Sequence, residues 1–300
     1  MNPATDNIFK LSSKKPEAVI FIRDESLEMK KDIQCDLFSG ISSTEFAVAL
    51  LDRKRNKFLA LEVFRTDAIT EPARQALWLK ETSKESIILK NDSFKKASVA
   101  IVNELTTLIP SALFRKEDAE KYFHFNFNEE DTVIHSEHIR SFDAVNTFAI
   151  SKPVEEAVNL IFNQPDIHHH ETALLEGIFL SFKKSNDKTL LLNIRDGYVD
   201  IIVTEGKKLI FINTFSYKTG NDLLYYVMFA CDRLQLNPEI ISAILMGSVE
   251  KETETYHLLY KYIRNVSFSP RLNVFDFSYV FNEIPAHFFF NLFSLALCES

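Results

Sequence analysis

The order of the elements expected between residues 189 and 298 constrains this chain most. Three β-rich runs, at 189–194, 197–204 and 208–215, are separated by short polar turns, which predicts a meander of hairpins. A helix is expected over 219–236, a short apolar strand over 241–249, a second helix over 252–265, and then a strand near 266–270 and an apolar helix over 287–298. This βββαβαβα order predicts a mixed α/β unit with helices packed on a sheet.

The first half of the chain repeats that opening. Strand-like runs at 33–40, 45–52 and 57–64 precede a helix at 71–85, with Pro72 in its first turn, where a missing N–H costs little. Further strands are expected at 97–110, 131–139 and 142–150, and helices at 111–125, 152–162 and 168–184. The repeated order is that of a duplicated ribonuclease-H-like unit. We therefore expect an N-terminal arm over 1–30 with an edge strand at 18–22, a first lobe over 31–165 and a second lobe over 166–300.

Charge and glycine content limit the ligands of such a protein. The net charge is −8, and no dense block of Lys and Arg occurs, which argues against a nucleic-acid partner. Six glycines in 300 residues is about 2%, against about 7% in proteins generally. Few positions therefore allow the backbone to approach a phosphate closely.

Cysteine usage and hydropathy favour a cytoplasmic location. Cys35, Cys231 and Cys298 are far apart and form no CxxC pair, so we expect neither a disulfide framework nor a structural zinc site built on cysteine. The N-terminus has no apolar leader, and the longest apolar run, residues 285–298, is too short to cross a bilayer. No integral membrane segment is expected.

Five segments, 55–64, 109–127, 142–150, 208–229 and 244–263, resemble an uncharacterised family of Bacteroidetes proteins described as having an actin-like ATPase fold. The resemblance covers roughly residues 30–275 and is most specific over 207–262. More distantly, the order of elements is similar to that of the actin-like proteins of type IV pilus assembly and type II secretion. The resemblance implies the two-lobed fold and assigns no activity.

Actin-like ATPases hold nucleotide phosphates at the first hairpin of each lobe, with a pattern close to D-x-G-x-x-x-[ST] whose glycines let N–H groups reach the ligand. In the second lobe Asn193 stands where the acid is expected and Arg195 where the glycine is expected. The following Asp196-Gly197 pair is typical of a two-residue hairpin turn. In the first lobe Asp36 is the matching acid, but Leu and Phe follow it.

These departures predict that phosphate handling has been lost and that no residue is catalytic. If a nucleotide binds between the lobes, as ATP with Mg²⁺, the candidate contacts are Asp36, Asp196, Gly247 and Ser248, the last two at a strand-turn that resembles the adenosine-contacting one.

The run of three histidines at 168–170 followed by Glu171 is a candidate metal site. Consecutive side chains face opposite ways on a strand and lie about 100° apart on a helix, so at most two of these histidines could share one ion. No Cys or His completes the set at helical spacing. We expect a solvated helix start or an inter-lobe hinge and assign no metal ligand; the alternative is a partial metal site or a pH-sensitive contact.

Two other features bear on partners. Aromatic residues at helical spacing should pack mostly on the sheet, and any that remain exposed would indicate an interface; they are Tyr225, Tyr226, Phe229, Tyr256, Tyr260 and Tyr262. The apolar helix at 287–298 is either deep core or a face that a partner covers.

The sequence thus predicts a non-enzymatic actin-like scaffold or interaction protein that binds a protein partner or itself. The alternative is a nucleotide-binding switch that uses the cleft between the lobes. An open polar cleft beside Asp36, Asp196 and Gly247 would favour the switch, whereas a cleft plugged by Phe38 or Arg195 would favour the scaffold.

Overall fold

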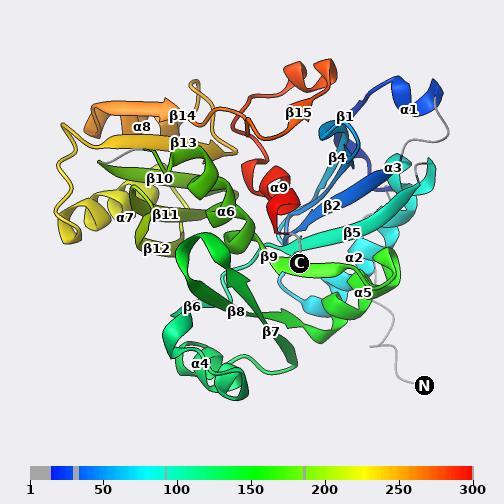
Figure 1. Ribbon diagram of the computed structural model, residues 1–300, viewed down its shortest axis with the longest axis horizontal. Helices are drawn as coiled ribbons and strands as arrows, with labels where there is room; N and C mark the ends of the chain where they lie inside the picture. Colours follow the sequence, from blue (N-terminus) through cyan, green and yellow to red (C-terminus); the bar gives the residue numbers. More distant parts are fainter. Residues whose placement is uncertain (1–14, 30–33, 92, 185–186, 299–300) are drawn as a thin grey trace, which may run out of the picture.

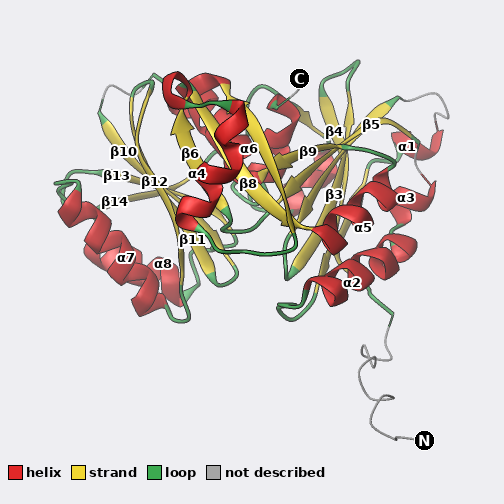
Figure 2. Cartoon of the chain, turned by 90° about the horizontal axis from the view of Figure 1, so that it is seen from below, coloured by secondary structure: helices red, strands yellow, loops and turns green. Residues whose placement is uncertain are grey.

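Two β-sheets with helices on their outer faces form two lobes that lie side by side (Figure 1). The computed structural model describes residues 15–29, 34–91, 93–184 and 187–298. Helices α2 (Pro72–Glu85) and α5 (Lys152–Phe162) cover the first sheet, while α7 (Gly220–Arg233) and α8 (Glu254–Tyr262) cover the second (Figure 2).

The first sheet has the strand order β1-β4-β3-β2-β5-β9, with β15 pairing alongside β4. Strands β1 to β4 pair antiparallel, whereas β2, β5 and β9 are parallel. The edge strand expected at 18–22 is confirmed as β1. The elements of this lobe are β1 (Ala18–Arg23), α1 (Ser26–Met29), β2 (Cys35–Ile41), β3 (Glu45–Asp52), β4 (Lys57–Arg65), α3 (Ile87–Asn91), β5 (Phe94–Ile101), β9 (Asp166–His169) and β15 (Asp276–Phe277).

The second sheet has the order β12-β11-β10-β13-β14. This order matches β4-β3-β2-β5-β9 strand for strand, and the same pairs are parallel, so the duplicated unit is confirmed. Its strands are β10 (Lys188–Arg195), β11 (Tyr198–Glu205), β12 (Lys208–Ser216), β13 (Ser242–Gly247) and β14 (Asn265–Phe268). The helix α7 begins with a capping box in which Thr219 and Asp222 exchange hydrogen bonds.

A third, three-stranded sheet in the order β6-β8-β7 is inserted between β5 and α5. The prediction of one strand over 97–110 is wrong here, because Asn103 bends the chain: its Oδ1 accepts a hydrogen bond from the backbone N–H of Leu105 at 3.0 Å. The chain then leaves the first sheet. The inserted elements are β6 (Thr106–Pro110), α4 (Ala119–Asn126), β7 (Thr132–Ile139) and β8 (Ala144–Ser151).

Helices α6 (His170–Phe182) and α9 (Phe290–Ser294) lie between the two sheets (Figure 1). They bury one aromatic-rich core against both lobes, and we call this cluster the interlobe core; it includes Phe58, Leu191, Ile202, Phe281, Phe290 and Phe293. The two helices pack closely because residue 177 is glycine: a Cβ there would lie 2.1 Å from Ser294 Oγ.

The apolar segment expected as one helix over 287–298 forms α9 and the 3₁₀ helix Leu295–Leu297, and α9 follows Phe289, whose φ is 56°. Phe290 and Phe293 are each 2% exposed, so the interpretation as core is confirmed. Short 3₁₀ helices elsewhere are Ser111–Leu113, Lys116–Asp118, Arg140–Phe142 and Tyr279–Glu283.

Two pieces of the expected second lobe, β9 and β15, hydrogen-bond to strands of the first sheet. The chain therefore returns to the first lobe after building the second. Within the described ranges, no helix is both long and apolar enough to span a membrane.

Candidate functional site

A cavity of about 890 Å³ lies between the lobes, where the first hairpin of each sheet faces the other. We call it the cleft. Asp196, Gly247 and Ser248, three of the four residues named as contacts for a nucleotide, line it. Asp36 does not join them, because β2 starts at Cys35 and reaches the cleft only at its other end. Its carboxylate instead accepts a hydrogen bond from Arg53 Nε at 2.6 Å.

Neither side chain expected as a plug closes the cleft. Phe38 is 1% exposed and packs in the interlobe core, with its ring 6.1 Å from that of Phe58. Arg195 lines the cleft, but its guanidinium binds Asp200 at 2.7 Å. The space between the two hairpins is therefore open.

The first hairpin uses three of its own backbone N–H groups in bonds within the turn. Ser42 Oγ accepts hydrogen bonds from the N–H groups of Thr44 at 3.1 Å and Glu45 at 2.8 Å. The Ser42 N–H donates to the Glu45 carbonyl at 2.9 Å. A phosphate-binding loop directs such N–H groups at the ligand, and here these three are used within the turn.

The glycines of the second lobe also serve the protein itself. Asp196 and Gly197, the latter at a φ of +73°, form the two-residue turn expected between β10 and β11. Gly247 has a φ of +82°, and a Cβ there would lie 2.2 Å from the Ile194 carbonyl oxygen. The N–H of Gly247 donates to the His287 carbonyl at 3.0 Å, and that of Ser248 donates to the Ile194 carbonyl at 2.8 Å.

The cleft is acidic. Its described lining has two arginines and no lysine, and both arginines are paired: Arg65 with Glu45 at 3.0 Å and Arg195 with Asp200. Burial raises the pKa of Glu45 against the opposing effect of Arg65, and the Asp196 carboxylate of the other hairpin adds to the rise. The seven acidic lining residues are Glu45, Glu71, Glu104, Glu129, Glu130, Asp131 and Asp196.

A fully buried carboxylate, that of Asp200 on β11, organises the floor of the cleft. It accepts hydrogen bonds from Asn193 Nδ2, Arg195 Nη2 and Thr214 Oγ1, each at 2.7 Å. Asn193 and Arg195, which replace the expected acid and glycine of the phosphate motif, are therefore held by Asp200. Both side chains are turned to the protein rather than toward a ligand.

The histidine run is not solvated, and that prediction is wrong. His168 and His169 end β9, His170 begins α6, and both His169 and His170 are 0% exposed. The inserted sheet covers them, because Glu137 of β7 contacts His168 Nδ1 at 2.7 Å and accepts from the His169 N–H at 2.7 Å. The run does lie where the chain passes from the first sheet to α6, as a hinge position would.

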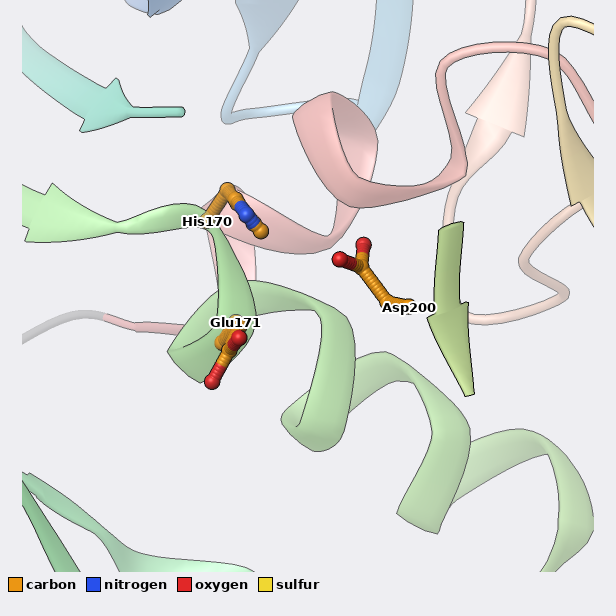
Figure 3. A group of neighbouring side chains, drawn as sticks. All are labelled: His170, Glu171 and Asp200. Carbon is orange, nitrogen blue, oxygen red and sulfur yellow. The ribbon is translucent and has the colours of Figure 1, made fainter. Parts of the chain in front are cut away.

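Three buried side chains converge beneath the cleft floor (Figure 3). His170 and Glu171 come from the first turn of α6, and Asp200 comes from β11. One ligand atom from each lies within 4.8 Å of the other two. Neither ring nitrogen of His170 has a hydrogen-bond partner within the described part of the chain.

Burial dominates the protonation of this cluster. It lowers the pKa of His170 well below 6.5, with His169 and Arg195 adding to the effect. Burial and then Arg195 lower the pKa of His169 to about 3. Burial and then Asp200 raise the pKa of Glu171 to about 8. At neutral pH, both histidines are uncharged.

Sequence reasoning did not identify Asp200 as part of a site. A signal was present: Asp200 is the single charged residue inside the apolar run Val199–Val203, and a carboxylate at such a position needs partners. Its hydrogen-bond partners, however, come from the two neighbouring strands, β10 and β12, and only the folded sheet joins them.

No curated protein sequence matches the chain. The family model described as "Protein of unknown function (DUF3822)" matches residues 24–266. The chain belongs to the DUF3822 family. The match spans both lobes and includes every cleft residue named above up to Ser248.

Solved structures share the fold of this DUF3822 protein. A Bacteroides thetaiotaomicron protein with an actin-like ATPase fold and unknown function is 22% identical, with a TM-score of 0.74 over 90% of this chain and 98% of that one. A chain of a PilM–PilN type IV pilus biogenesis complex is 14% identical, with a TM-score of 0.62 over 87% of this chain and 97% of that one. The ethanolamine utilization protein EutJ of Carboxydothermus hydrogenoformans is 7% identical, with a TM-score of 0.50 over 89% of each chain. This DUF3822 protein therefore has the actin-like ATPase fold.

Proposed function

We propose that this protein is a non-catalytic scaffold whose cleft holds a positively charged segment of a partner protein. The observation that carries the proposal is the charge of the cleft. Seven carboxylates line it; Glu45 is paired with Arg65 and Asp131 with Lys152, and the other five have no ion pair within the described residues. Opposite charge steers partners to such a surface and fixes their orientation.

The same charge argues against a nucleotide. A triphosphate between the hairpins would meet Glu45 and Asp196 with no unpaired cation among the described lining residues. The N–H groups of Ser42, Thr44 and Glu45 are also already bonded. Binding would require these bonds to break without compensation from the lining side chains.

A second surface supports a role in assembly. Tyr225 and Phe229 on α7 are 63% and 41% exposed, and Tyr260 on α8 is 58% exposed. Tyr225 stacks on Phe229 with centroids 6.1 Å apart. The PilM–PilN complex, a neighbour in fold, is an assembly with a partner protein, and a scaffold with a cleft and an aromatic face would suit a similar use.

We expect millimolar Mg-ATP to leave the midpoint of thermal unfolding unchanged. A ligand at 100 times its Kd adds about 2.7 kcal/mol of stability, which would raise the midpoint by several degrees. Differential scanning calorimetry with Mg-ATP, with ATP plus EDTA and with Mg²⁺ alone tests this. A rise that requires both Mg²⁺ and ATP would contradict the scaffold assignment.

A basic peptide should bind through the cleft. We expect a fluorescein-labelled octalysine peptide, followed by anisotropy at 0.15 M salt, to lose about tenfold in affinity for the Glu129→Lys/Glu130→Lys variant, since rim charges govern such attraction. The matched control is Asp232→Lys/Glu252→Lys. It changes the net charge equally, from −8 to −4, at exposed sites outside the cleft lining. Equal losses in both variants would show nonspecific attraction and would count against the proposal.

The nucleotide-binding switch is the second candidate, because the cleft is open and Gly247 and Ser248 line it. This function requires the Mg-dependent rise described above. It further requires the rise to persist in the control variant Asp232→Lys/Glu252→Lys and to change in the cleft variant.

A further inference from the structure

We propose that His170, Glu171 and Asp200 bind one divalent transition-metal ion, such as Zn²⁺, beneath the floor of the cleft. The inference is independent of the scaffold function. It concerns a buried cluster that lies outside the lining of the cleft.

The geometry brings three ligand atoms to one point from two elements of the fold. The first turn of α6 supplies His170 and Glu171, and β11 supplies Asp200 from the facing sheet (Figure 3). Their ligand atoms lie within 4.8 Å of one another. Ligands of a tetrahedral ion at 2.0–2.2 Å stand about 3.4 Å apart, so small side-chain rotations would close the set.

The unpartnered ring of His170 is the second observation that points to a bound ion. Its ring is 0% exposed, and within the described chain neither nitrogen has a hydrogen-bond partner. Burying such a polar group without a partner is unfavourable. A metal ion would take the lone pair of the neutral imidazole, which is a common metal ligand.

The donor set selects the class of ion. One imidazole nitrogen and two carboxylates suit zinc and similar first-row ions, whereas Mg²⁺ and Ca²⁺ prefer oxygen ligands alone. Three protein ligands leave a further coordination position open, as in catalytic rather than structural zinc sites.

The neighbouring Arg195 lowers the affinity expected of this cluster for a cation. Its guanidinium binds both oxygens of Asp200, at 2.7 and 3.2 Å, so Asp200 shares its charge between Arg195 and the ion. Glu171, whose Oε1 lies 2.9 Å from Thr214 Oγ1, has a raised pKa and would have to release its proton to supply the remaining negative charge. We therefore expect binding weaker than that of structural zinc sites, with a Kd on the order of micromolar.

The full chain, treated with EDTA and dialysed, should bind one Zn²⁺ in isothermal titration calorimetry and one Co²⁺ with the absorption of a low-coordinate site. MgCl₂ should produce no heat at the same concentration. We expect Glu171→Gln, which keeps the side-chain shape, and His170→Ala each to weaken binding at least about tenfold, as loss of a ligand does.

The surface residue His257 is exposed and is the matched control for adventitious zinc. His257→Ala should retain full binding. Circular dichroism establishes that each variant is folded. If His170→Ala does not fold, zinc binding by Glu171→Gln alone tests the proposal. Absence of stoichiometric binding, which would leave a water molecule as the partner of His170, overturns the proposal. Binding that Glu171→Gln leaves intact overturns it equally.

Discussion

Replacing Phe293 with alanine is expected to lower the free energy of unfolding by about 3–5 kcal/mol, the usual cost of deleting a buried phenyl ring. Phe293 is 2% exposed, and its ring centroid lies 4.8 Å from that of Phe58 and 5.1 Å from that of Phe277. Phe293 lies on α9, which packs between the sheets, and the substitution removes its contacts in the interlobe core. Urea unfolding followed by far-UV circular dichroism measures the change.

Two controls make the result specific. Phe125 is 89% exposed on α4, so Phe125→Ala should change stability by no more than about 0.5 kcal/mol. Phe293→Leu keeps most of the apolar volume and should cost less than Phe293→Ala. If Phe293→Ala were no more costly than Phe125→Ala, the interlobe core would not hold the lobes together.

Replacing Asp200 with alanine is expected to cost about 3 kcal/mol or more, because it leaves the Arg195 guanidinium without its carboxylate in a largely buried position. Asn193 and Thr214 lose their acceptor at the same time. Chemical unfolding followed both by circular dichroism and by the fluorescence of Trp78, which lies in the first lobe, measures the effect. Circular dichroism reports both lobes and Trp78 fluorescence reports the first, so the transition seen by circular dichroism should begin at a lower denaturant concentration than the one seen by fluorescence.

A double-mutant cycle separates the ion pair from the packing. Arg195→Met alone should also destabilise the protein, since it leaves a buried carboxylate with neutral partners only. The double variant Asp200→Ala/Arg195→Met removes both charges, and it should be less destabilised than the sum of the single variants. Strict additivity would mean that Asp200 and Arg195 contribute independently.

Much of the fold follows from the sequence because hairpin turns and strand runs are local features. The pair Asp196-Gly197 predicted the turn between β10 and β11, and the helix expected over 219–236 is present as α7. The inserted sheet was missed because a bend at Asn103 divides what looks like one strand. The length of the last helix was overestimated, because apolar content indicates burial equally well in an α-helix and in a 3₁₀ turn.

The site was harder to predict. Asp196, Gly247 and Ser248 meet at the cleft because the fold fixes where the first hairpin and β13 end. Asp36 does not lie at the cleft. It stands near the start of β2, and residue type alone does not set where along a strand a residue falls. The cluster of His170, Glu171 and Asp200 depends on the approach of α6 to β11, which no spacing along the chain encodes.

The last aromatic residues of the chain complete the first lobe, and this ordering has a consequence for synthesis. Phe58 on β4 packs against Phe275, Phe277 and Phe293, with ring centroids 4.8–5.3 Å apart. On the ribosome, β4 emerges long before these partners, so the inner face of the first sheet has no aromatic cover until residues 275–293 appear. Domains generally fold as units from the N-terminus during synthesis. Here the N-terminal lobe cannot finish first, and a nascent chain stalled before β15 would present an apolar sheet face to other proteins.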